Sequence, residues 1–120
     1  MKPGLIPSEA QEQTALVSHL RLALGRDWKV AAIPNGGSRN VLEAVNLKRQ
    51  GVLPGIPDLV LLGPAGTTIW IEMKSKTGKL SAEQGAMNAW MVDQGHICLV
   101  CYGRDDAISQ LQKMRVLKCR

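Results

Sequence analysis

The sequence that decides the fold is Pro57-Asp-Leu-Val-Leu-Leu-Gly-Pro-Ala-Gly-Thr-Thr-Ile-Trp-Ile-Glu-Met-Lys74. Two segments rich in Leu, Val and Ile lie on either side of a Gly-Pro-Ala-Gly turn. This pattern is typical of a β-hairpin, so we expect strands over Asp58–Leu62 and Thr68–Lys74.

Charged residues stand at the open end of this hairpin. Side chains alternate between the two faces of a strand, so Glu72 and Lys74 share one face and Met73 points to the other. Asp58 begins the first strand and can lie across the hairpin beside Glu72. Charge at the end of an apolar strand is costly to bury unless it is paired or bound to a metal.

Two carboxylates, with the main-chain carbonyl of Met73, offer the hard oxygen ligands that Mg²⁺ or Mn²⁺ prefers. A bound ion polarises a phosphate and acidifies a water, which Lys74 could orient or help to deprotonate. The pattern therefore indicates phosphodiester hydrolysis, with Asp58, Glu72 and Lys74 as the catalytic set. The alternative is an ordinary ion pair between Glu72 and Lys74 on an edge strand, which contributes little to stability.

The whole chain is expected to form one domain over residues 1–120, with a core over about 8–104 and a basic C-terminal helix within 105–120. Apolar spacing, serine caps and glycine terminators distinguish the helices from the strands. The order α-β-α-β-β-α-β-α implies an α/β fold with a mixed central sheet flanked by helices. Outside the hairpin, the expected helices run from Ser8 to about Leu24, over Asn40–Gln50, from Ser81 to Gly95 and over Asp105–Leu117, and the expected strands are Trp28–Ile33 and His96–Tyr102.

The composition favours a soluble protein with a polyanionic partner. The 15 Lys and Arg residues against 10 Asp and Glu give a formal net charge of +5, which fits DNA without demonstrating it. Phe is absent, so Leu, Ile, Val and Met must fill the core. The sequence has no apolar run of membrane-spanning length and no signal-peptide pattern, so we expect a cytoplasmic protein without a membrane partner.

Cysteines raise one competing interpretation. Cys98 and Cys101 form a C-x-x-C near His96, as in a small zinc redox protein, but no second ligand pair stands at suitable spacing. An odd count of three cysteines without a secretory signal points to a reducing compartment. The apolar run around the pair favours buried structural cysteines.

The hairpin and the residues after it resemble a known family. The run Gly51–Leu62, the strand Ile-Glu-Met-Lys74, and Gly78-Lys-Leu-Ser81 followed by Gln84 are similar to the virus-type replication-repair nuclease (VRR-NUC) domain of the PD-(D/E)xK superfamily. The resemblance extends from Ser8 to Arg104. It implies a restriction-endonuclease-like core and Mg²⁺- or Mn²⁺-dependent cleavage of DNA. Members that stand alone, often from phages, resemble homodimeric endonucleases of branched DNA such as Holliday junctions, and larger eukaryotic relatives trim flaps. A phage or bacterial cytoplasm is therefore implied.

The resemblance gives the hairpin residues metal-binding and catalytic roles, and it adds an acidic residue of the first helix followed one turn later by glutamine. Glu9 and Gln13 have this i, i+4 spacing, so Glu9 is implied as a metal ligand and catalytic residue, and Gln13 as a DNA contact. Glu12 falls on the same helix face and stays an alternative to Glu9. A charged first turn that stabilises the helix N-terminus would explain these acids without any function.

Four further polar residues match the family pattern. Gln84 would contact a phosphate or brace Lys74, although it also stands where a helix cap is expected. Asn35, in a Pro-Asn-Gly-Gly loop, would touch the DNA backbone, although asparagine is common in turns. Lys76 and Lys79 follow the catalytic strand and would hold phosphates in a salt-dependent manner.

Symmetric cutting of a four-way junction requires two active sites, so a two-fold homodimer is expected, with the residues from Arg39 to Gln50 as a candidate contact element. The competing function is a non-catalytic DNA-binding module of the same fold, which would need no divalent ion. Such a module has no physical reason to keep Asp58, Glu72 and Lys74 together. The sequence leaves open which DNA structure is preferred.

Overall fold

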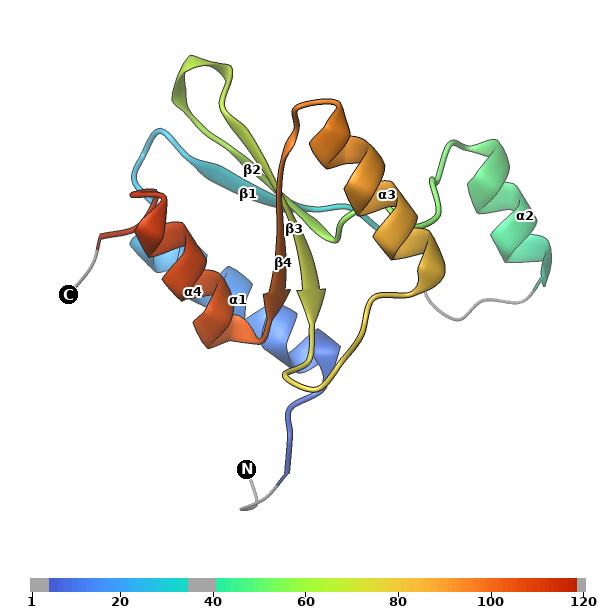
Figure 1. The fold of residues 1–120 in the computed structure, drawn as a ribbon, viewed down its shortest axis with the longest axis horizontal. Coiled ribbons are helices and arrows are strands. Elements are labelled where there is room, and N and C mark those ends of the chain that lie inside the picture. The colour runs from blue at the N-terminus through green and yellow to red at the C-terminus, as the bar shows by residue number, and fades with distance from the viewer. Residues whose placement is uncertain (1–4, 35–40, 119–120) are drawn as a thin grey trace.

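A computed structural model describes residues 5–34 and 41–118 of the chain (Figure 1). Its helices and strands occur in the order expected from the sequence. They are α1 (Glu9–Ala23), β1 (Lys29–Ala32), α2 (Val41–Arg49), β2 (Leu59–Leu62), β3 (Thr68–Lys74), α3 (Ala82–Asp93), β4 (Ile97–Tyr102) and α4 (Arg104–Lys113), with a short 3-10 turn, η1 (Pro64–Gly66), between β2 and β3. No helix in the described ranges is both long and apolar enough to cross a bilayer.

The four strands form one mixed sheet in the order β1-β2-β3-β4. β1 pairs antiparallel with β2, and β2 and β3 are the antiparallel arms of the expected hairpin. β4 returns after α3 and runs parallel to β3, as a strand-helix-strand crossover requires. The α/β class, the mixed sheet and the order of elements are therefore confirmed.

One face of the sheet carries the core. The register pairs Leu59 with Ile71 and Leu61 with Ile69, and directly paired residues point to the same face. These side chains are at most 1% exposed, and each contributes about 2 kcal/mol by leaving water. The helices on this face cover them with the buried residues Leu16 and Leu20 of α1 and Ala107 and Leu111 of α4. Aliphatic side chains thus fill the core, as the absence of Phe requires.

The opposite face of the sheet carries the polar end of β3. Trp70, Glu72 and Lys74 alternate with the core residues and point to this face. α3 lies on this side, away from α1 and α4, and buries Met91 (Figure 1). α2 projects from the margin of the molecule and contains no buried residue.

The last helix is shorter than expected, because α4 ends at Lys113 and not at Leu117. Arg115 has a φ of 63°, and the N–H groups of Arg115 and Val116 bond back to carbonyls of the last turn. This is a Schellman ending, which reverses the chain. Leu117 returns to the core and is 4% exposed, although it lies outside the helix.

The two described cysteines lie on opposite faces of β4. Cys101 is buried in the core, whereas Cys98 is half-buried. Residues three apart in a strand point to opposite sides and do not hold one ion. Burial, with a smaller effect of the Asp106 charge, raises the pKa of Cys101 to about 12, so its thiol stays protonated. The structure thus favours structural cysteines over a zinc pair; Cys119 lies outside the described residues.

Candidate metal centre

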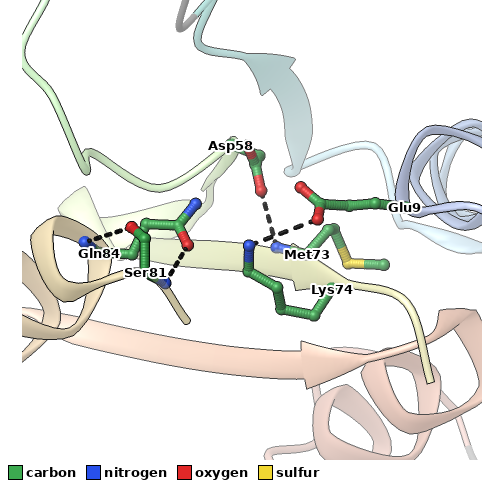
Figure 2. A network of polar contacts seen from close by, with 6 residues as sticks. All are labelled: Glu9, Asp58, Met73, Lys74, Ser81 and Gln84. Carbon is green, nitrogen blue, oxygen red and sulfur yellow. Dashed lines mark hydrogen bonds and ion pairs between the residues drawn. The ribbon is translucent and has the colours of Figure 1, made fainter. Parts of the chain in front are cut away.

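Asp58 lies where the chain enters the hairpin, one residue before the start of β2. Continuing the register by one pair places it opposite Glu72. Its Oδ2 accepts a hydrogen bond of 2.8 Å from the N–H of Met73, and its carbonyl accepts one of 2.8 Å from the N–H of Ile33. Because both its side chain and its main chain are bonded to neighbouring strands, the carboxylate is held beside β3 (Figure 2).

The main chain of Met73 faces the same side as Asp58. The N–H and C=O of one strand residue point the same way, and this N–H points to Asp58. One further register step places Pro57 opposite Met73, and proline has no N–H. Pro57 therefore has no N–H to donate to the Met73 carbonyl, and we regard the Met73 oxygen as a candidate ligand.

The segment before Asp58 is pressed against the first turn of α3. Gly55 has a φ of 81°, and a Cβ on it would lie 2.6 Å from the carbonyl oxygen of Glu83. Neither the conformation nor the space admits a side chain. The start of α3 therefore sets the path along which the chain reaches Asp58.

Three carboxylates from three elements converge at this end of the sheet. Glu9, Asp58 and Glu72 each offer an oxygen, and these oxygens all lie within 4.8 Å of one another. The Lys74 Nζ lies 3.3 Å from Glu9 Oε2 (Figure 2). Glu72 is 3% exposed and Lys74 is 7% exposed, so these two side chains of β3 are held firmly. We call Glu9, Asp58, Glu72 and Lys74 the acidic cluster.

The acidic cluster holds more negative charge than Lys74 neutralises. Burial first, and then the hydrogen bond and charge of Asp58, raise the pKa of Glu72 to about 9; Lys74 opposes this shift and Glu9 adds to it. In the absence of a cation, Glu72 therefore keeps a proton near neutral pH.

The donor set fits a divalent cation. The Oε2 of Glu72 is buried and has no hydrogen-bond partner among the described residues. Buried polar oxygens normally have a donor, and a carboxylate without one is costly. Carboxylate and carbonyl oxygens are the ligands that Mg²⁺ and Mn²⁺ favour. An acidic group that could bind a metal ion is therefore present.

Of the two acids on the first helix, Glu9 reaches Asp58 and Glu72, and Glu12 does not. Glu12 accepts a hydrogen bond of 3.1 Å from the N–H of Arg104, at the start of α4. Gln13, one turn after Glu9, is half-buried and makes no hydrogen bond to the cluster within the described part of the chain.

Residues 7–105 match the model of the VRR-NUC domain family. The chain belongs to the VRR-NUC family. Two solved structures resemble it. One is named a VRR_NUC domain protein: it is 22% identical with a TM-score of 0.70, and the match covers 90% of this chain and 88% of the other. The second, a VRR_NUC domain, is 16% identical with a TM-score of 0.59, covering 88% and 94%. At these identities the likeness establishes the fold. None of the curated proteins compared with the chain matches it.

Gln84 of this VRR-NUC domain closes the capping box expected at the start of α3. Its Oε1 accepts the N–H of Ser81 at 2.9 Å, and the Oγ of Ser81 accepts the N–H of Gln84 at 3.1 Å (Figure 2). Its Nε2 makes no hydrogen bond within the described ranges. The side chain also lines a hollow of about 430 Å³ between α2 and the start of α3, where Lys48 lies. The cap is confirmed, whereas contact with a phosphate or with Lys74 stays a prediction.

Two of the remaining residues predicted to contact nucleic acid lie in the described part of the chain, and neither is tested as a contact. Lys76 and Lys79 are exposed in the segment that leaves β3. Asn35 lies outside the described residues. Sequence reasoning missed the role of Pro57 and the contact of Glu12 with α4, because each depends on a partner far along the chain.

Proposed function

We propose that this VRR-NUC domain is a Mg²⁺- or Mn²⁺-dependent endodeoxyribonuclease that hydrolyses phosphodiester bonds in branched DNA, such as Holliday junctions or flaps, in replication, repair or recombination. The observation that carries the proposal is the convergence of Glu9, Asp58 and Glu72 within 4.8 Å, with the Lys74 amine beside them. A cytoplasm, bacterial or of a phage-infected cell, suits the free cysteines.

Asp58, Glu72 and Glu9, with the carbonyl of Met73, would hold the ion. The chemistry that a divalent ion supplies when bound is Lewis-acid polarisation of a phosphate and acidification of a water. Asp58 keeps one oxygen for this purpose, because only its Oδ2 is engaged by Met73. Glu72 would hold the ion with a carboxylate that is 3% exposed, so bulk water has little access to this ligand.

Lys74 would supply a positive charge to the reacting phosphate from beside the carboxylates. Its stem is buried along β3, so the amine has little freedom and stays beside the carboxylates. From there it orients the attacking water and offsets the charge that develops on phosphorus. Glu9 accepts a hydrogen bond of 3.3 Å from this amine and keeps it beside the carboxylates.

Exposed cations in the segment that follows β3 supply the affinity for DNA. Lys76 and Lys79 follow β3 directly, and the net charge of +5 favours a polyanion. Gln84, Gln13 and Asn35 are proposed as further contacts to the DNA backbone.

A cleavage assay tests the proposed function. Labelled four-way junctions, flaps, nicked duplexes and plain duplexes are incubated with the protein in Mg²⁺, in Mn²⁺ and in EDTA. We expect cuts at branch points in either metal and none in EDTA. Salt-dependent DNA binding that is indifferent to the metal, without cleavage of any substrate, would identify a non-catalytic module instead.

We further propose that the protein acts as a two-fold homodimer through α2. Val41 and Leu42 are 80% and 70% exposed, and a helix of this length gains little stability without packing. Leu42→Glu is expected to convert a dimer into a monomer in sedimentation experiments. Leu22→Glu, at a position 90% exposed on α1, is the matched control and should leave the dimer intact. A wild-type monomer, or equal behaviour of the two variants, would exclude this interface.

A further inference from the structure

Glu12 is a buried acid that the proposed chemistry does not use. It is 6% exposed, its Oε1 accepts the N–H of Arg104 at 3.1 Å, and its Oε2 is buried without a partner among the described residues. Burying a half-satisfied carboxylate is costly, and a shorter polar side chain would reduce that cost. The position therefore requires a physical explanation beyond stability.

The contact of Glu12 belongs to a closed circuit of bonds around the acidic cluster. The N–H of Gly103 bonds to the carbonyl of Lys74 at 2.9 Å, and the next N–H, that of Arg104, bonds to Glu12. Glu12 lies one helical turn after Glu9, and Glu9 binds the Lys74 amine at 3.3 Å. Lys74 is thus contacted at its carbonyl by Gly103 and at its amine by Glu9. The contact of Glu12 with Arg104 connects these two through α1.

Gly103 allows the circuit to close. Its φ is 98°, and a Cβ on it would lie 3.1 Å from Glu12 Oε2 and 3.1 Å from Lys76 Cγ. A side chain at this corner would push against the carboxylate of Glu12. The corner between β4 and α4 is therefore shaped to receive the acid from α1.

We propose that Glu12 is a positioning residue that sets the first turn of α1 against the end of β3, so that Glu9 meets Asp58 and Glu72. This inference rests on the proposed metal-dependent function. Residues that orient metal ligands typically change metal affinity by about 10- to 100-fold when they are removed. A residue that merely capped α4 would change stability and leave the metal affinity of the correctly folded protein unaltered.

Titration calorimetry with Mn²⁺ alone tests the role of Glu12. Glu12→Ala is expected to weaken Mn²⁺ binding about tenfold, whereas Glu12→Gln, which keeps an oxygen for the Arg104 N–H, should stay within about threefold of wild type. Glu12→Gln also removes the charge, so it separates the hydrogen bond from simple electrostatic attraction. Unfolding in EDTA is measured in parallel for each variant.

The same substitutions in a Glu9→Ala background show whether Glu12 affects Mn²⁺ binding through Glu9 or independently of it. If Glu12 acts through Glu9, Glu12→Ala causes no further loss once Glu9 is gone. Equal losses in both backgrounds, or no loss in either, would overturn the inference. Should Glu12→Ala fail to fold, Glu12→Asp, which withdraws the carboxylate by one methylene, is expected to give the same dependence on Glu9. A wild-type protein that binds no Mn²⁺ would refute the proposed function itself, and this inference with it.

Discussion

Replacing Lys74 with methionine is expected to lower the rate of DNA cleavage about a thousandfold while Mn²⁺ binding persists. Methionine keeps an unbranched apolar stem in the buried site and removes only the charge, so the strand should remain intact. The carboxylates are unchanged, and the loss of a nearby cation should slightly strengthen metal binding. Single-turnover cleavage and Mn²⁺ titration on the same preparation measure the two effects separately.

Lys76→Met is the matched control for this substitution. Lys76 is exposed two residues further along the chain, where a cation attracts DNA without facing the acidic cluster. Lys76→Met is expected to weaken DNA binding about threefold or less, with little change in the rate at which the bound complex cleaves DNA. Full activity of Lys74→Met, or loss of metal binding together with activity, would contradict the assigned role.

The affinity for a divalent ion is expected to rise about tenfold per pH unit between about pH 6 and about pH 8. Glu72 has a pKa raised to about 9, so it carries a proton over this range and must release it when the ion binds. Calorimetry in buffers of different ionisation enthalpy should detect about one released proton per ion. An affinity independent of pH would mean that Glu72 is not a ligand.

Stability without metal should have the opposite dependence on pH. The folded protein binds the Glu72 proton more tightly than the unfolded chain, whose value is near 4.5, so this group stabilises the fold at low pH and the stabilisation is lost as pH rises toward 9. Glu72→Gln removes the titration and should make the variant progressively more stable than wild type in EDTA as pH rises. Addition of Mn²⁺ should then stabilise only the wild type. Denaturant unfolding at several pH values measures both effects.

The hairpin was predictable because its information is local. Alternation along β3 and a turn of small residues fix the register, and the register alone brings the positions of Asp58 and Glu72 together. Gln84 was predictable as a cap for the same reason, since its partner Ser81 is three residues away.

The sequence favoured Glu9 over Glu12 through the spacing of Glu9 to Gln13, but it left Glu12 as an alternative. Both acids fall on the face of α1 that carries Leu16 and Leu20, so their spacing to these core residues does not separate them. Their environments differ because the corner before α4 binds Glu12, from a position 92 residues away in sequence. Only the tertiary structure brings that corner to α1.

The end of α4 illustrates a second limit. The expected helix ran to Leu117, which does reach the core, but by a chain reversal and not as a helical residue. Glycine usually marks the left-handed residue of such an ending, whereas here Arg115 adopts it. Without glycine the local sequence carries no stop signal.

Pro57 has a consequence for the engineering of metal sites on β-sheets. Its nitrogen carries no hydrogen, so it cannot donate to the Met73 carbonyl that an extension of the β2–β3 register would place opposite it. A proline can thus leave a backbone oxygen on the neighbouring strand free to accept a metal ion, with no new side chain added. A designer who wants one more oxygen at a strand terminus could begin with a proline on the adjacent strand.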